Sequence, residues 1–115
     1  MESILTSIKK LLGYEADDTG FDDEIVAEIN AVLMSLTQMG VGPSEGFEIT
    51  DATTTWDAFV PDMKKFGAIK SYVHKRVRLA FDASTMSSSL VECYNRQIAE
   101  FEWRLNHAAE CNTEN

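Results

Sequence analysis

Apolar residues recur at intervals of three and four along four segments of this chain, and this spacing most constrains its fold. The longest series begins at Phe21 and ends before Gly40, and a helical projection places its apolar members on one face. These members are Phe21, Ile25, Ile29, Val32, Leu36 and Met39. No segment alternates convincingly like a strand, and FEI at 47–49 is the only candidate. The pattern predicts an all-α fold, a small bundle of about four helices with an irregular central loop.

The first two predicted helices have recognisable ends. One covers residues 4–12, and Gly13 is placed to stop it. The other covers residues 21–39, with Thr19 as a candidate N-cap and Gly40 at its close. Three acidic residues in the first turn of the second helix suit the positive end of the helix dipole.

The second half of the chain starts with an irregular segment at 41–61, rich in Gly, Pro and Thr. Its Thr-rich run precedes a short helical turn that carries Trp56. A third helix is predicted over 66–81 and a fourth over 89–108. The capping box SLVE at 89–92 is expected to start the fourth helix.

Length and composition are those of one folded domain. A chain of 115 residues with 44% hydrophobic content can bury roughly two-thirds of its unfolded surface. We assign residues 1–108 to a single helical domain and residues 109–115 to a polar, flexible tail. Cys93 and Cys111 fit no CxxC or Cys/His pattern, which predicts two free thiols. Polar residues interrupt the apolar N-terminal stretch, so we expect neither a signal peptide nor a membrane span, and a soluble intracellular protein when made.

The formal net charge of -9 is unevenly distributed. Residues 1–62 hold 13 acidic and 2 basic side chains, whereas residues 63–115 hold 6 acidic and 8 basic ones. Such polarity favours head-to-tail contact between copies, although many monomers also show it.

The predicted helix over 66–81 carries two apolar strips. Its core strip comprises Ile69, Val73, Val77 and Ala80, and Lys75 and Arg78 point the opposite way. A second strip comprises Ala68, Tyr72 and Leu79. An exposed second strip would promote unwanted association. Two coverings remain open for it: the 40–61 segment of the same chain, or another subunit.

Four basic side chains stand close together on this helix: Lys70, Lys75, Arg76 and Arg78. They suggest an alternative function, a small helical nucleic-acid-binding regulator that uses the basic helix 66–81. The helix lacks a helix-turn-helix partner and belongs to an acidic chain, which argues against that function. A solvated basic face or contact with an acidic surface of another copy fits better. A third possibility is an acidic inhibitor that binds a host protein without self-assembly.

The sequence shows no catalytic constellation. His74 and His107 have no acidic residue at ligand spacing, and no nucleophile elbow, phosphate loop or zinc motif occurs. The acidic cluster at 22–24 is explained by the helix dipole. We therefore expect no enzyme activity, no catalytic residue, no metal and no cofactor.

The predicted last helix has an apolar seam and one aromatic residue out of place. The seam comprises Leu90, Val91, Tyr94, Ile98, Phe101, Leu105 and Ala108. Trp103 projects to the other side, among Glu92, Arg96, Ala99 and Glu100. Either the 40–61 segment or the first helix covers Trp103, or it is an interface anchor, a role in which tryptophan is enriched.

Four segments in this order resemble the head-tail connector proteins, also called head completion or adaptor proteins, of long-tailed phages and prophages of Gram-positive bacteria. They read FDDEIVAEINAVLMSLTQMGVG, TTTWDAFV, KSYVHKRVRLAFD and SSSLVECYNRQIAEFEWRLN. The likeness covers residues 1–106, and the pairing of VRLAFD with a terminal EWRLN is its most specific part. Two places depart from the pattern, His74–Lys75 and Ala83–Ser84, where an aromatic–aliphatic pair and prolines are more usual.

The resemblance implies a mostly α-helical structural virion component without catalytic activity. About twelve copies would form a ring beneath the portal after viral DNA packaging, join the DNA-filled head to the tail and extend the DNA channel. The implied partners are other copies of the chain, the portal protein and the downstream neck, stopper or tail-completion protein. Genomic DNA would pass through without sequence-specific binding, and no membrane would be involved.

The same resemblance implies a location in the virion neck, at the head-tail interface, and in the host cytoplasm before assembly. Together with the second apolar strip and the basic side chains, it suggests a candidate subunit or portal interface. This comprises Tyr72, Lys75, Arg76, Arg78, Leu79 and Trp103.

Overall fold

The chain folds into helices joined by irregular segments, as the apolar spacing predicts. The computed structural model describes residues 2–61 and 63–113, with the side chains of 2–61 and 67–107. Its elements are α1 (Ile4–Leu12), α2 (Asp22–Gln38), α3 (Trp56–Phe59), α4 (Met63–Asp82), the 3₁₀ turn η1 (Ala83–Thr85) and α5 (Ser88–Thr113). The all-α prediction is confirmed. The described residues contain no strand at 47–49 or elsewhere, and show a single isolated bridge between Ser3 and Thr55.

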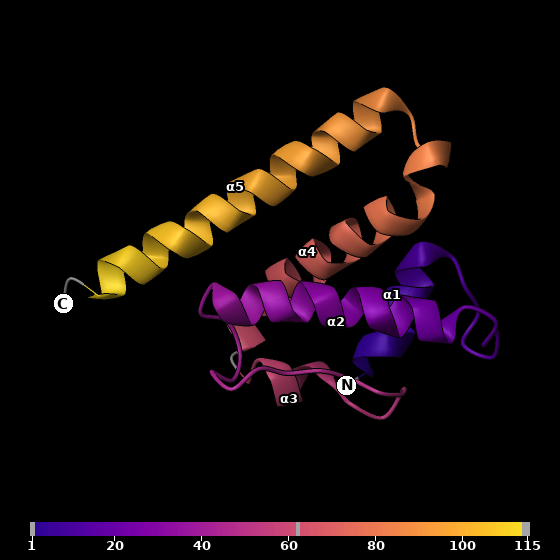
Figure 1. Cartoon of the computed structure of the whole chain (residues 1–115), viewed down its shortest axis with the longest axis horizontal. Helices are drawn as coiled ribbons and strands as arrows, with labels where there is room; N and C mark the ends of the chain where they lie inside the picture. The colour runs from indigo at the N-terminus through magenta and orange to yellow at the C-terminus, as the bar shows by residue number, and fades with distance from the viewer. Residues whose placement is uncertain (1, 62, 114–115) are drawn as a thin grey trace.

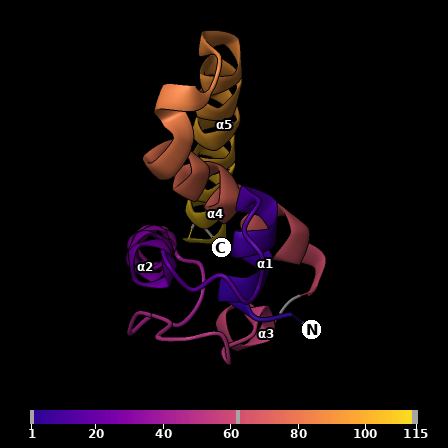
Figure 2. The same cartoon turned by 90° about the vertical axis from the view of Figure 1, so that its right-hand side faces the viewer.

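Helix α4 lies at the centre of the molecule. It packs against α1 and α2 on one side and against α5 on the other, so that α5 crosses the top of the bundle (Figure 1). A view from the side shows α5 standing above α4, with α1, α2 and α3 below (Figure 2). Buried apolar side chains from all five α-helices form one core. None of the described helices is long and apolar enough to cross a membrane.

The predicted core faces are largely confirmed. On α2, Ile25, Ile29, Val32 and Leu36 are buried, together with Leu33, which the helical projection did not include. Two predicted members differ. Phe21 is half-exposed because it precedes the first helical turn, and Ala80 is exposed because Leu79 and Phe81 pack against the core at its end of α4.

Helix starts depart from the predicted caps. Thr19 does not cap α2; Phe21 holds the cap position without a side-chain hydrogen bond. The box at 89–92 does not start α5, because the hydroxyl of Ser87 accepts the Leu90 N–H (3.1 Å) two residues earlier. Three consecutive serines offer the same capping chemistry, and the extended backbone at Met86 after η1 determines which one is used. The described helices α4 and α5 also run three and five residues beyond the predicted outer ends, to Met63 and Thr113.

Lys9 is buried although it lies near the end of a short surface helix. Its side chain is 3% exposed, and its ammonium donates to the carbonyl of Ala16 (3.1 Å) and lies 2.8 Å from a carboxylate oxygen of Asp22. The latter is an ion contact without hydrogen-bond alignment, since that oxygen has no hydrogen-bond partner. The lysine therefore connects α1, the following loop and the first turn of α2.

Two side chains hold the irregular 40–61 segment against the bundle. The Asn30 amide donates to the carbonyl of Ile49 (2.9 Å) and accepts its N–H (2.7 Å), as a neighbouring strand would. The indole of Trp56 donates to the hydroxyl of Ser7 (2.7 Å), in the buried face of α1. These contacts place the segment along α2 and α1.

Asn30→Ala tests this attachment, because it removes both hydrogen bonds to Ile49. Each contributes roughly 0.5–1.5 kcal/mol net, so the free energy of unfolding should fall by about 1–3 kcal/mol in denaturant melts. The matched control is Asn95→Ala, an exposed position of α5, which should change stability by less than about 0.5 kcal/mol. Equal effects of the two variants would contradict a structural role for the Asn30 amide.

Candidate functional site

Helix α5 covers Tyr72, the largest member of the second apolar strip. Tyr72 is 2% exposed, and its ring centroid lies 4.9 Å from that of Phe101. Its hydroxyl donates to Glu102 (2.6 Å) and accepts from Arg76 (2.8 Å), whose guanidinium lies 3.7 Å from the same carboxylate. Neither covering proposed from the sequence was correct for Tyr72, because Phe101 and Glu102 of α5 contact it, whereas Ala68 of the same strip is exposed.

The Tyr72 hydroxyl is held in its protonated form. Burial, and next the hydrogen bond to the Glu102 carboxylate, raise the pKa of Tyr72 to about 12. The group therefore stays a hydrogen-bond donor at all ordinary pH values. Sequence spacing gave no sign of Glu102, because the two partners lie 30 residues apart and meet only after α4 and α5 pack.

A second polar contact joins the same two helices. Arg78 donates to the hydroxyl of Tyr94 (2.7 Å), and its guanidinium lies 5.5 Å from the centroid of that ring. Arg76 and Arg78 thus hold α5 on α4. Lys75 lines a small groove between the two helices, and Leu79 is half-buried against the core. This arrangement does not favour a DNA-binding face of four free cations.

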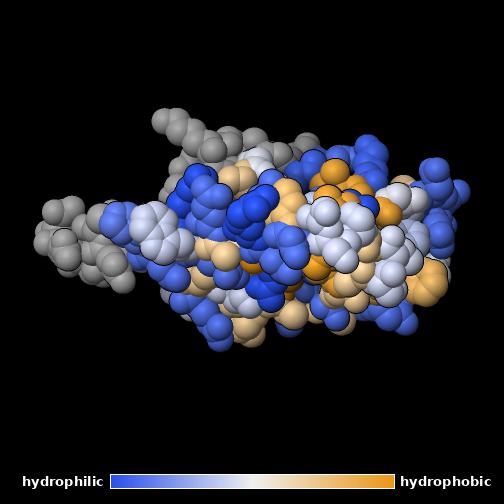
Figure 3. All heavy atoms as spheres, turned by 90° about the horizontal axis from the view of Figure 1, so that it is seen from above, coloured by the Kyte–Doolittle hydropathy of each residue, from blue (hydrophilic) through white to orange (hydrophobic). Residues whose placement is uncertain are grey.

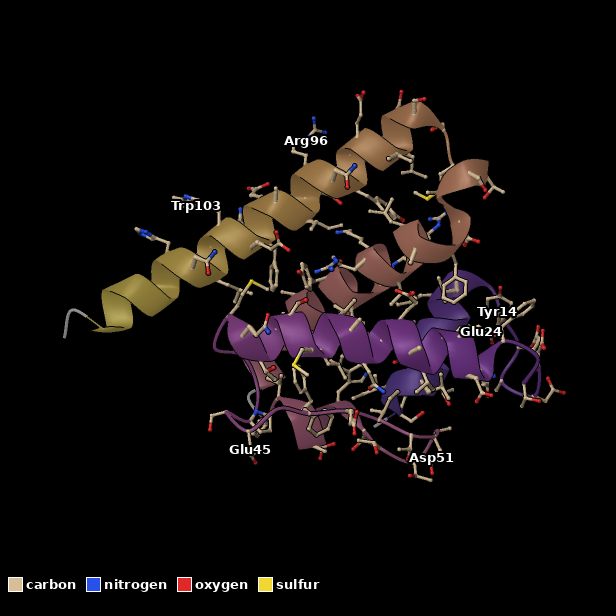
Figure 4. All side chains as sticks on the ribbon, viewed as in Figure 1. Tyr14, Glu24, Glu45, Asp51, Arg96 and Trp103 are labelled. Atoms are coloured by element: carbon tan, nitrogen blue, oxygen red, sulfur yellow. The ribbon has the colours of Figure 1, made fainter. Side chains whose placement is uncertain are left out.

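The outer face of α5 carries an uncovered aromatic pair. Trp103 is 64% exposed, and its ring stacks on that of His107 with centroids 5.0 Å apart. Neither the 40–61 segment nor α1 covers it, so intramolecular burial of Trp103 was a wrong expectation. Figure 4 shows Trp103 and Arg96 pointing away from the bundle.

The surroundings of this pair are polar. Seen from the α5 side, much of the described surface is hydrophilic (Figure 3). Glu100 and Arg104, four residues apart, form an ion pair (2.6 Å). Glu92 and Arg96 have the same spacing but do not pair, and Arg96 forms no ion pair among the described residues. The outer face therefore offers one large aromatic side chain and one arginine whose guanidinium is not engaged in an ion pair with a described residue.

His74 sits between α1, α4 and α5. Its ring centroid is 6.3 Å from that of Tyr94, and its Nε2 is buried without a hydrogen-bond partner. Burial, and next the charges of Arg78 and Lys75, lower the pKa of His74, while the backbone of Leu11 acts weakly in the opposite direction. The imidazole therefore favours its neutral form in the folded protein.

The described residues contain no group of three or more His, Cys, Asp and Glu that could hold a metal ion. Cys93 is a half-buried free thiol, whereas the side chains of Cys111 and Ala108 lie outside the described residues. The functional features described above are therefore apolar contacts, hydrogen bonds and ion pairs.

The sequence matches the phage connector protein family over residues 4–112. The chain belongs to the phage connector family. The resemblance noted in the sequence is thereby confirmed. As a phage connector, the chain is a structural component of the virion at the junction of head and tail, and it acts together with other head or tail proteins. No curated protein and no solved structure matches the chain.

Tyr72→Phe should loosen α5 from α4 in this connector, because it removes the hydroxyl that joins Arg76 to Glu102. We expect the free energy of unfolding to fall by about 1–2 kcal/mol. The loss is smaller than for fully buried hydrogen bonds to charged groups, because Arg76 and Glu102 are both partly exposed. Denaturant melts measure the loss. Tyr14→Phe is the control, since that hydroxyl makes no hydrogen bond among the described residues; a similar loss in both variants would contradict the assigned role.

Acid should destabilise the protein through His74. Because the folded pKa is below the ordinary value of 6.5, the unfolded chain binds the proton first as pH falls. The contribution of neutral His74 to the free energy of unfolding is therefore fully present above about pH 6.5. It is lost as the pH falls from there through the folded pKa of His74. Thermal midpoints between pH 7.5 and pH 5 should fall more steeply for the wild type than for His74→Gln, with His107→Gln as the control. If the thermal midpoints of the wild type and His74→Gln fell equally steeply with pH, His74 would not be the cause of the acid destabilisation.

Proposed function

We propose that this connector forms a ring beneath the portal, joins the DNA-filled head to the tail and extends the channel through which DNA passes. The carrying observation, beside family membership, is the division of α5 into two faces. Its inner face is used by Tyr72, Arg76 and Arg78 of α4, while its outer face leaves Trp103 uncovered. Tryptophan is enriched among the residues that contribute most to protein-protein binding, which supports Trp103 as an anchor for another protein.

The charge of the chain supports a channel role. A ring of about twelve copies, each of formal charge -9, would carry on the order of -100 charges. A lining of that sign repels DNA phosphates, so that the genome slides without adhering. The ring would meet the portal on one side and a neck, stopper or tail-completion protein on the other, would assemble from copies made in the host cytoplasm, and would need no cofactor or catalysis.

The interface residues named from the sequence divide into two groups under this proposal. Tyr72, Arg76 and Arg78 act indirectly, because their contacts with Glu102 and Tyr94 hold α5 in place, and Leu79 packs against the core. Trp103 on the outer face of α5, and Lys75 at the groove between α4 and α5, are left for a partner. The division follows from the contacts that each side chain already makes within the chain.

Trp103→Ala separates assembly from folding. The side chain is mostly exposed, so the thermal midpoint of the isolated protein should stay within about 2 °C of the wild type. Incorporation into portal complexes, measured by native mass spectrometry, should be lost, and particles should contain packaged heads without tails. Leu11→Ala, which truncates another exposed apolar side chain, is the control and should still be incorporated. Normal incorporation of the Trp103 variant would contradict the anchor, and absence of the wild type from portal complexes would contradict the proposed function.

A further inference from the structure

A groove runs along α2 on a different side of the molecule from Trp103. It has a volume of about 620 Å³ and is lined by Ala27, Asn30, Ala31, Met34 and the segment 45–48. We call it the α2 groove. No described residue fills it.

The floor of the α2 groove is apolar and its rim is acidic. Ala27 and Ala31 are short enough to leave a depression, and Met34 is 53% exposed in it. Glu45 and Glu48 stand on the rim, are exposed, and form no ion pair among the described residues. The hydrogen bonds between Asn30 and Ile49 hold the wall of the groove at a constant distance from α2.

The outer face of α5 carries groups that can complement this groove. Trp103 supplies a large apolar ring, and Arg96, on the same face, supplies an exposed guanidinium that forms no ion pair among the described residues. These two residues are seven positions apart, two helical turns or roughly 10 Å. Ala27 and Met34, at the ends of the groove floor, are also seven positions apart, so the two surfaces have matching lengths.

One molecule cannot join its own two surfaces. Figure 4 shows Trp103 and Arg96 on the edge opposite to Glu45. A contact between them requires two molecules, and it uses different surfaces of each. Repeated contacts of this heterologous kind close into a ring when the rotation between copies is suitable.

We propose that Trp103 of one copy inserts into the α2 groove of a second copy, with Arg96 facing the acidic rim of Glu45 and Glu48. Tryptophan in an apolar pocket is the usual centre of a binding hot spot, and a methionine side chain adapts well to an aromatic ring. The opposed charges select the partner and its direction. This inference rests on the proposed ring, and it names the surface that each copy contributes.

Two variants test the contact, each removing one surface. Trp103→Ala removes the anchor, and Ala31→Arg places a long cation in the groove floor at an exposed helical position that tolerates arginine. Self-association of concentrated protein without portal is measured by sedimentation velocity and native mass spectrometry. Each variant alone should associate at least about tenfold more weakly than the wild type.

An equimolar mixture of the two variants gives the decisive result. One copy supplies an intact Trp103 and the other an intact groove, so the mixture should form a one-to-one dimer that neither variant forms alone and that does not grow further. Controls are Ala80→Arg, the same substitution at an exposed site of α4, and Leu11→Ala; both should associate like the wild type.

Three outcomes would overturn the contact: a wild type that stays monomeric when concentrated, variants that associate normally, or folded variants whose mixture forms no dimer. A different outcome would contradict the proposed function alone. A wild type that associates through this contact, yet does not join portal complexes, contradicts the portal ring and leaves the contact established.

Discussion

The burial of α4 on two sides is the constraint on which the rest of the structure depends. Ile69, Val73 and Val77 pack toward α1 and α2, while Tyr72 packs beneath α5. Without α5, the second strip of α4 would expose a tyrosine that is now 2% accessible, and without α4, α5 would lack its main neighbour. The central position of α4 therefore makes the last helix part of the same domain.

The two faces of α5 differ in how much apolar surface they expose. Its apolar seam is packed against α4, so that its outer face is mostly charged and polar around a single indole. A single exposed indole offers less area for unspecific association than a continuous apolar strip would.

Much of the fold was predictable, because helical periodicity is a local property. The faces of α1, α2 and the middle of α4 followed from apolar spacing, and Gly13 ends α1 in the left-handed conformation that its position suggested. The same spacing placed Trp103 opposite the seam, but it left open whether the 40–61 segment or the first helix covers the indole. These features depend on neighbours within one or two helical turns.

What could not be predicted depends on residues distant in sequence. Lys9 is buried because Asp22 and the carbonyl of Ala16 meet it across a loop, and Asn30 binds a backbone 19 positions away. The capping serine of α5 depends on how η1 ends, and the α2 groove depends on where the 45–48 segment is held. Each of these features depends on how distant segments pack together, and local sequence patterns do not specify that packing.

The hydrogen bond between Tyr72 and Glu102 also determines the phase of the last helix. Successive residues of an α-helix are rotated by about 100°, so a carboxylate tied to α4 leaves the next side chain, Trp103, no inward direction. The contacts of Tyr94 with Arg78, two turns earlier, repeat the same restraint. One inserted residue between Tyr94 and Glu102 would put these two restraints out of register by about 100°. Polar groups at the contact between α4 and α5 thus help to set the direction in which the exposed indole points.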